Sequence, residues 1–210
     1  MSRPDLNKVL SCEDQAAIQG YQIDALKPDF LIFSTKISRC RALTRKEKRQ
    51  GASLEVLSNI LGGGASSRLF RRLVVNAKIA VSSGAYYSGD HRGPGRFVFY
   101  ASPRGDTPLE VLEKSIATEI TDIIKNGVTR EEVEEAKERM AAEAIYARDS
   151  LSGGARILGA ALASGLTVKD VESWPERIAA ITQDEIQSAA KALFNNKNSV
   201  TGILLPIEDH

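Results

Sequence analysis

The stretch Leu61–Phe70 reads Leu-Gly-Gly-Gly-Ala-Ser-Ser-Arg-Leu-Phe. Apolar residues recur at helical spacing on both sides of it: Leu54, Leu57, Ile60 and Leu61 before, and Leu69, Phe70, Leu73 and Val74 after. Glycine ends helices readily because it adopts positive φ at little steric cost. We therefore expect one helix to end with Gly62 in the left-handed conformation. A second helix should begin where Ser66 or Ser67 accepts a hydrogen bond from its first free N–H groups.

The glycine-rich segment is itself a candidate binding site. It comprises Gly62, Gly63, Gly64, Ser66, Ser67 and Arg68. Glycines before a helix can expose backbone N–H groups to an anion. A phosphate-binding loop, however, ends in Gly-Lys-Ser/Thr and follows a strand, and this sequence offers neither feature. A connection between two helices is therefore the favoured interpretation.

Read with its surroundings, Leu61–Phe70 resembles the Leu-Gly-Gly-Gly-x-Ser-Ser-Arg-Leu-Phe/Tyr segment of one family of zinc metallopeptidases. This is the pitrilysin/insulinase family, which includes the mitochondrial processing peptidase, and the segment belongs to its carboxy-terminal, non-catalytic half. The resemblance runs from about Phe30 to Pro206 and is most specific at the glycines. It implies an α+β fold in which helices pack on one face of a mostly antiparallel sheet.

The resemblance implies that this chain carries no catalytic residue and no metal site. The catalytic half of the family has His-x-x-Glu-His on a helix, where two histidines hold zinc and the glutamate is the general base. No such motif occurs here, and the two histidines are His91 and His210. The counterpart helix offers Leu54, Leu57 and Ser58 near the ligand positions. Zinc is accordingly expected in a catalytic partner domain, not in this chain.

The sequence also departs from the family at a pair of substrate-binding residues. Many members carry an Arg and a Tyr seven residues apart that hydrogen-bond the peptide, and ungapped alignment places Val74 and Val81 there. Valine side chains cannot donate to a carbonyl. The nearest donors, and our candidate substrate-binding residues, are Arg71, Arg72, Tyr86 and Tyr87. Each also has a purely structural interpretation, as a helix-surface charge or a strand residue.

The sequence pattern independently favours α+β. Capping boxes are predicted at Thr44/Glu47, Thr107/Glu110, Thr129/Glu132, Ser173/Glu176 and Thr182/Glu185, and Pro108 and Pro175 suit first turns. Two apolar stripes follow, Leu109, Leu112, Ile116, Ile120 and Ile123, then Val133, Ala136, Met140, Ala144 and Ala147. Strands are predicted at Ile18–Ile23, Phe30–Ile37, Ala80–Tyr87, Arg96–Ser102 and Val200–Leu205, with a hairpin turn at Asp90–Gly95. Strand pairs followed by groups of helices are typical of α+β domains.

Other stretches have simpler interpretations. Ser152-Gly153-Gly154 should break the helical region, and the acidic residues between Glu131 and Glu138 are expected to form a solvated helix face. We expect residues 1–17 to be a linker or disordered segment and residues 18–210 to be the domain.

Composition excludes some partner classes. The 210 residues have a formal net charge of +1, so no strong attraction to nucleic acid or a membrane surface is expected. Cys12 and Cys40 are too few for a disulfide framework. The bacterial periplasm and the cytoplasm are both compatible with the sequence, and a homodimer is allowed.

The leading hypothesis is a non-catalytic carboxy-terminal domain that closes the peptide-binding chamber over a catalytic His-x-x-Glu-His domain, fused or separate. Its expected partners are that catalytic domain and a peptide substrate. The alternative is a catalytically silent scaffold, like the core subunits of the respiratory cytochrome complex. The chain by itself is expected to be inactive.

Overall fold

The computed structural model describes residues 30–37, 45–89, 95–147, 149–150, 152–194 and 199–204. Its strands are β1 (Phe30–Ile37), β2 (Ala80–Ser88), β3 (Gly95–Pro103) and β4 (Ser199–Leu204). Its helices are α2 (Arg45–Gly62), the π-helix η1 (Phe70–Asn76), α3 (Leu109–Asn126), α4 (Arg130–Ala147), α5 (Gly153–Ser164), α6 (Val168–Glu172), α7 (Trp174–Ala179) and α8 (Gln183–Leu193).

The four strands form one antiparallel sheet in the order β2-β3-β1-β4. Phe99 in the centre of β3 pairs with Phe33 of β1 on one side and with Ala85 of β2 on the other. Four of the predicted strands match observed ones to within about one residue at each end. The predicted strand at Ile18–Ile23, the Asp90–Gly95 turn and the 1–17 segment lie wholly or mainly outside the described residues.

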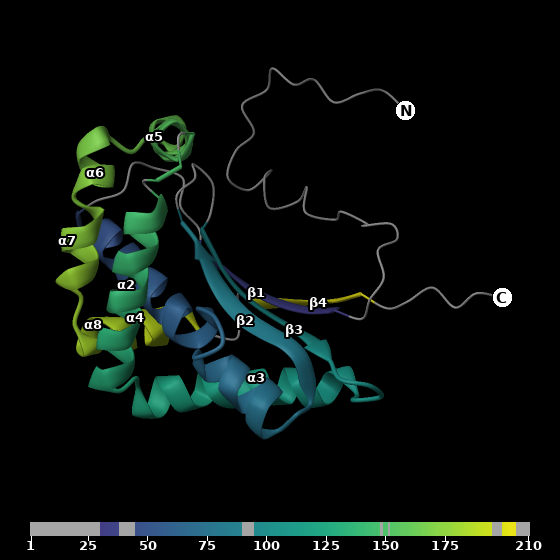
Figure 1. Cartoon of the computed structure of the whole chain (residues 1–210). Coiled ribbons are helices and arrows are strands. Elements are labelled where there is room, and N and C mark those ends of the chain that lie inside the picture. Colours follow the sequence, from purple (N-terminus) through teal and green to yellow (C-terminus); the bar gives the residue numbers. More distant parts are fainter. Residues whose placement is uncertain are drawn as a thin grey trace, which may run out of the picture.

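The described helices gather on one side of the sheet, as predicted for this fold class (Figure 1). Phe97 and Phe99 of β3 are fully buried beneath them, and the ring of Phe194, just after α8, lies 5.3 and 5.6 Å from their ring centroids. Helix α2 crosses between the sheet and the outer helices and contacts β2, α4 and α8. The core therefore lies between the sheet and the helices that cover it, and it includes residues of α2, α3, α4 and α8.

The predicted apolar stripes are largely confirmed. Leu112, Ile116, Ile123, Val133, Ala136 and Met140 are buried, while Leu109 and Ile120 are partly buried against the core. The second stripe was extended too far, because Ala147 is exposed at the end of α4. The break at Ser152–Gly154 is also confirmed, since α4 ends at Ala147 and α5 begins at Gly153.

Two of the predicted capping boxes are present, at Thr129/Glu132 and Thr182/Glu185. Two others were wrong. Thr107 Oγ1 donates to the carbonyl of Arg104 at 2.7 Å, so α3 begins after Pro108, which is its N-cap and not in its first turn. Ser173 Oγ accepts a hydrogen bond from Arg177 Nη1 at 3.0 Å, which leaves α7 without a side-chain cap.

Pro175 does occupy the first turn of α7, and residue 44 of the remaining predicted box is outside the described part. The capping box at Thr167/Asp170, in which Asp takes the place of the usual Glu or Gln at the third position after the cap, was not predicted from the sequence.

Candidate functional site

The glycine-rich segment connects α2 to the next helix, as predicted, but the roles of its residues differ. Gly62 is still helical, and the positive φ of 95° belongs to Gly64. A Cβ on Gly62 would lie 1.8 Å from the backbone nitrogen of Ala85, so glycine is needed there for close contact between α2 and β2. One on Gly63 would lie 2.5 Å from the carbonyl oxygen of Asn59.

The predicted serine cap is wrong. The hydroxyl of Ser67 is buried and makes no hydrogen bond within the described structure, and it is the Ser67 carbonyl that accepts from the Arg71 N–H at 3.0 Å. Ser66 is exposed at the rim of a cavity. The side chain that holds this segment in place is instead Arg68.

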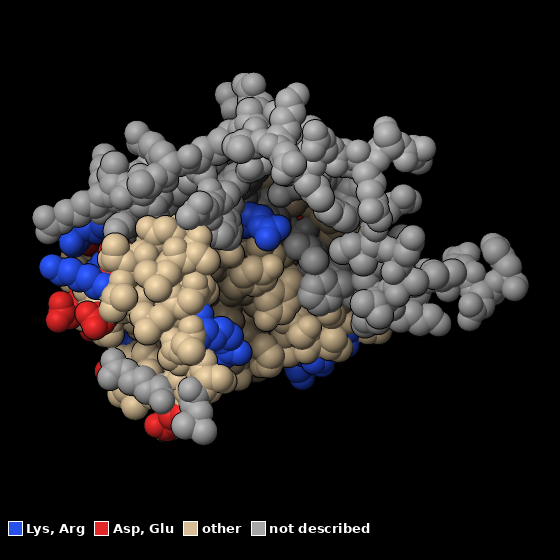
Figure 2. Space-filling model, turned by 90° about the horizontal axis from the view of Figure 1, so that it is seen from above, with Lys and Arg blue, Asp and Glu red and all other residues tan. Residues whose placement is uncertain are grey.

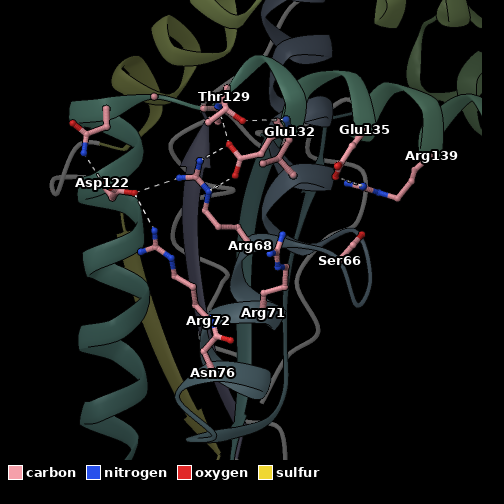
Figure 3. Close-up of a pocket in the computed structure, with 14 residues that line it drawn as sticks. Ser66, Arg68, Arg71, Arg72, Asn76, Asp122, Thr129, Glu132, Glu135 and Arg139 are labelled. Atoms are coloured by element: carbon pink, nitrogen blue, oxygen red, sulfur yellow. Dashed lines mark hydrogen bonds and ion pairs between the residues drawn. The ribbon is translucent and has the colours of Figure 1, made fainter.

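Arg68 reaches from the end of the glycine-rich segment to the first turn of α4 (Figure 3). Its Nε and Nη2 donate to the two carboxylate oxygens of Glu132 at 2.8 and 2.6 Å. Its Nη1 lies 3.4 Å from Asp122 on α3. Only 12% of the Arg68 side chain is exposed. This one guanidinium therefore ties three segments together, and such bidentate pairs are the stronger class of ion pair.

The electrostatics of this pair follow from its burial. Burial alone would raise the pKa of the Glu132 carboxyl, but hydrogen bonds from Arg68 and from the Thr129 N–H hold it below its usual value. Burial likewise opposes the charge on Arg68, yet Glu132 raises the pKa of the guanidinium. Both groups are therefore charged at neutral pH. The expectation of a solvated acidic face was wrong at Glu132, because this residue pairs with Arg68. The sequence pattern did not show the pair, since Arg68 lies 64 residues earlier in the chain.

Arg72, one turn further along, belongs to the same cluster. It forms an ion pair with Glu119 of α3 and lies 3.5 Å from Asp122. Glu119 is buried with 3% of its surface exposed, and burial raises the pKa of its carboxyl even though Arg72 and Arg68 lower it. Arg72 therefore already has partners within the domain.

A cavity of about 440 Å³ lies beside this cluster. Arg71 lines it from η1, and Ser66, Glu135 and Arg139 lie across the space from Arg71 (Figure 3). The Arg71 side chain forms no ion pair or hydrogen bond with a described residue. Of the two candidate arginines, Arg71 is thus the one with donors still available to a ligand.

A second, larger cavity of about 930 Å³ forms a groove between β2, α2, α4 and α5. Tyr86 and Tyr87 line it from the strand. Tyr86 is 51% exposed, whereas Tyr87 is partly buried with its ring centroid 6.4 Å from that of Phe97. Tyr86 is therefore the more accessible of the two tyrosines.

The four candidate substrate-binding residues thus lie in two places. Arg71 and Arg72 line the smaller cavity, and Tyr86 and Tyr87 line the groove. The hydrogen bond from Arg139 Nε to Asn59 Oδ1, at 3.1 Å, joins a residue of the first cavity to one of the second. The sequence pointed to neither cavity directly, since each is lined by residues from several elements far apart in the chain.

The described residues include no group of three or more His, Cys, Asp or Glu side chains arranged to hold a metal ion. No helix in the described ranges combines the length and apolar character that a membrane crossing requires.

Comparison with known proteins decides the family. Residues 41–140 match the family model described as the peptidase M16 inactive domain. An uncharacterized zinc protease of Rickettsia felis is 31% identical over 142 residues, which is 68% of this chain and 34% of that protein. One of Streptomyces coelicolor is 26% identical over 80% of this chain and 36% of its own length. The chain belongs to the pitrilysin (M16) family.

The fold agrees with this assignment. The inactive peptidase domain of a Bordetella parapertussis protein described as a zinc protease superposes with a TM-score of 0.75 at 18% identity, covering 89% of this chain and 95% of that one. This pitrilysin-family chain spans about a third of the length of the curated relatives that it matches. It is an inactive, carboxy-terminal type of domain.

In this pitrilysin-family domain, most of the residues that we aligned with functional positions of the family pack in or against the core. Leu54 and Leu57 of α2 have no exposed surface, and Ser58 Oγ donates to the carbonyl of Glu55 at 2.8 Å. Val74 packs partly buried against the core, whereas Val81 is 54% exposed at the start of β2. Helix α2 therefore contributes to the core through the side chains that we aligned with metal ligands.

Proposed function

We propose that this chain is the non-catalytic half of a zinc-dependent metalloendopeptidase, and that it closes a peptide-binding chamber against a catalytic His-x-x-Glu-His domain. The observation that carries the proposal is the packing of α2, the helix that we aligned with the zinc-binding helix of the family. The side chains of Leu54 and Leu57 are fully buried in the hydrophobic core. Because this face of α2 packs in the core, its side chains are not placed to bind a metal. This supports a structural role for the chain, with the zinc and the general base supplied by another domain.

Within that function we propose Arg71 and Tyr86 as the substrate-contacting residues. Both present donors to a cavity, whereas Arg72 is ion-paired with Glu119 and Tyr87 is less exposed than Tyr86. A donor that is already ion-paired must lose that pairing before it can bind a peptide carbonyl.

The scaffold interpretation rests on Val74 and Val81. Neither side chain can hydrogen-bond a peptide, and Val81 is exposed at the strand start where a tyrosine would stand in many relatives. Under this alternative the domain would associate with its partner without affecting turnover.

Zinc content and peptide hydrolysis distinguish these cases. The purified chain should hold no stoichiometric zinc and hydrolyse no peptide, and activity should appear when a catalytic domain of the same family is added. One tightly held zinc per chain, with hydrolysis abolished by a chelator, would overturn the proposal.

A further inference from the structure

Helix α3 turns one carboxylate towards the core. Among the described residues, Glu119 is the one charged side chain that is buried, with 3% of its surface exposed. It shares the face of α3 that carries the buried residues Ile116 and Ile123. Its Oε1 accepts from Arg72 Nη1, whereas its Oε2 is buried and has no hydrogen-bond partner among the described residues. The negative charge of Glu119 is therefore only half satisfied where it lies.

The charged groups that act on Glu119 come from three segments. Arg72 on η1 and Arg68 just before it favour the ionised carboxylate, whereas Asp122, one turn further along α3, disfavours it. Burial is the largest effect, and it raises the pKa of the Glu119 carboxyl. The strand β3 and helix α8, which also contact α3, contribute apolar side chains to the core. By contrast, Figure 2 shows charged side chains scattered over a mainly uncharged surface, where water solvates them. Glu119 therefore takes up a proton more readily than an exposed glutamate does.

Arg72 already reaches a second carboxylate on the same helix. Its Nη2 lies 3.5 Å from Asp122 Oδ2 (Figure 3). Asn126 Nδ2 donates to the other oxygen of Asp122 at 2.7 Å, so this acceptor is held in place. The backbone at Arg72 is also held, because its carbonyl accepts from the Ala77 N–H at 2.9 Å. Arg72 thus has two acceptors one turn apart on α3, and only its side chain has to move between them.

The two acceptors differ in their relation to the smaller cavity. Asp122 and Arg72 line it together with Arg71, whereas Glu119 lies outside the lining. A neutral Glu119 carboxyl no longer attracts the guanidinium as an ion, and the Asp122 carboxylate remains as its acceptor. A proton on Glu119 therefore favours a position of Arg72 closer to the cavity.

We propose that Glu119 and Arg72 form a proton-operated switch, in which protonation of Glu119 releases Arg72 from the core and turns it to Asp122 at the cavity wall. With Glu119 ionised, the guanidinium is held between the two carboxylates. With Glu119 neutral, it pairs with Asp122 alone, and the cavity gains positive charge beside Arg71. The switch does not rest on the peptidase function, because every group in it belongs to this domain.

The test is an NMR titration of the whole chain from about pH 7.5 to about pH 4. It follows the carboxyl carbon of Glu119 and the Nε–H group of Arg72, each assigned through the backbone. We expect a Glu119 midpoint above the ordinary value of 4.5, and an Arg72 resonance that changes with the same midpoint. A midpoint at or below 4.5, or an Arg72 resonance that does not follow Glu119, would overturn the proposal.

Three variants separate the two acceptors. Glu119→Gln is neutral at every pH, so its Arg72 resonance at pH 7 should lie close to the acid position of the unmodified chain and should not titrate. Glu110→Gln, an exposed acid in the first turn of α3, should leave the Arg72 titration unchanged. Asp122→Asn removes the second acceptor, so the heteronuclear NOE of the Arg72 Nε–H should fall at least twofold in acid. An Arg72 as ordered in that variant as in the unmodified chain would contradict the exchange of partners.

The same spectra distinguish the switch from acid unfolding. A raised pKa means that the folded state binds the proton more tightly than the unfolded state. The resulting stabilisation is fully present below pH 4.5 and is lost as the pH rises through the folded-state value. The backbone amide resonances of Ile116 and Ile123 should therefore keep their folded positions at the Glu119 midpoint. Their loss at that midpoint would overturn the proposal, and the titration of the unmodified chain decides the matter even where Glu119→Gln does not fold.

Discussion

Arg68 and Glu132 are joined by two hydrogen bonds, of 2.8 and 2.6 Å, between the end of the glycine-rich segment and the first turn of α4. Glu132 also accepts from the Thr129 N–H at 2.8 Å, so the same carboxylate caps the helix and holds the arginine. The position of the segment after the three glycines thus depends on one ion pair between residues far apart in the sequence.

Arg68→Ala should destabilise the domain by about 2 kcal/mol or more, because it leaves the half-buried Glu132 carboxylate without its charged partner. Urea unfolding at neutral pH measures the change. Arg130→Ala is the matched control, since Arg130 is exposed at the start of α4 and should change stability by less than about 0.5 kcal/mol. Equal effects of the two substitutions would show that the ion pair does not stabilise the fold.

Gly62→Ala should lower the free energy of unfolding by about 3 kcal/mol or more, because the new Cβ would lie 1.8 Å from the Ala85 backbone nitrogen. Gly159→Ala in α5 has open space around the new Cβ and should stabilise the domain by about 0.5–1 kcal/mol, since alanine favours the helix. Thermal melts of both variants test whether the melting temperature falls in Gly62→Ala and rises in Gly159→Ala. A harmless Gly62→Ala would mean that α2 and β2 are not in close contact.

Glu185 should make stability depend on acid pH. Hydrogen bonding from Arg49 is the main cause that lowers the pKa of its carboxyl from 4.5 to about 2, with help from the Thr182 cap. The folded state holds the charged form more tightly than the unfolded state, so the stabilisation is fully present above pH 4.5 and is lost as the pH falls towards 2.

Glu185→Gln should therefore flatten the stability profile between these pH values. Because the pair is partly exposed to solvent, the loss at pH 7 should be only about 1 kcal/mol. Urea unfolding at several pH values gives the comparison. A variant with the same acid dependence as the unmodified chain would contradict the assignment.

Arg71→Ala and Tyr86→Phe test the substrate contacts in a complex with the catalytic domain. Loss of a preorganised donor lowers turnover strongly, and we expect at least one variant to lose tenfold or more (~1.4 kcal/mol) with an unchanged melting temperature. Arg130→Ala again provides the surface-charge control. If both variants keep full turnover, donors from these two positions are not used.

Local signals predicted the elements well and the site poorly, for a physical reason. The alternating strands, the apolar stripe of α3 and the Thr182/Glu185 cap depend on neighbours in sequence, and each is confirmed. The role of Gly62 depends on Ala85, and the pairing of Arg68 depends on Glu132, so neither could be found from spacing alone. Likewise, Arg71 and Tyr86 line different cavities, each built from several elements far apart in the chain.

The most direct test of the peptidase function is the hydrolysis of a labelled peptide by three samples: a zinc-loaded catalytic domain of the same family, this chain, and an equimolar mixture. We predict no hydrolysis by this chain, little by the catalytic domain, and at least a tenfold increase in the mixture, because the chamber needs both halves. A mixture no more active than the catalytic domain by itself would contradict a chamber-forming role.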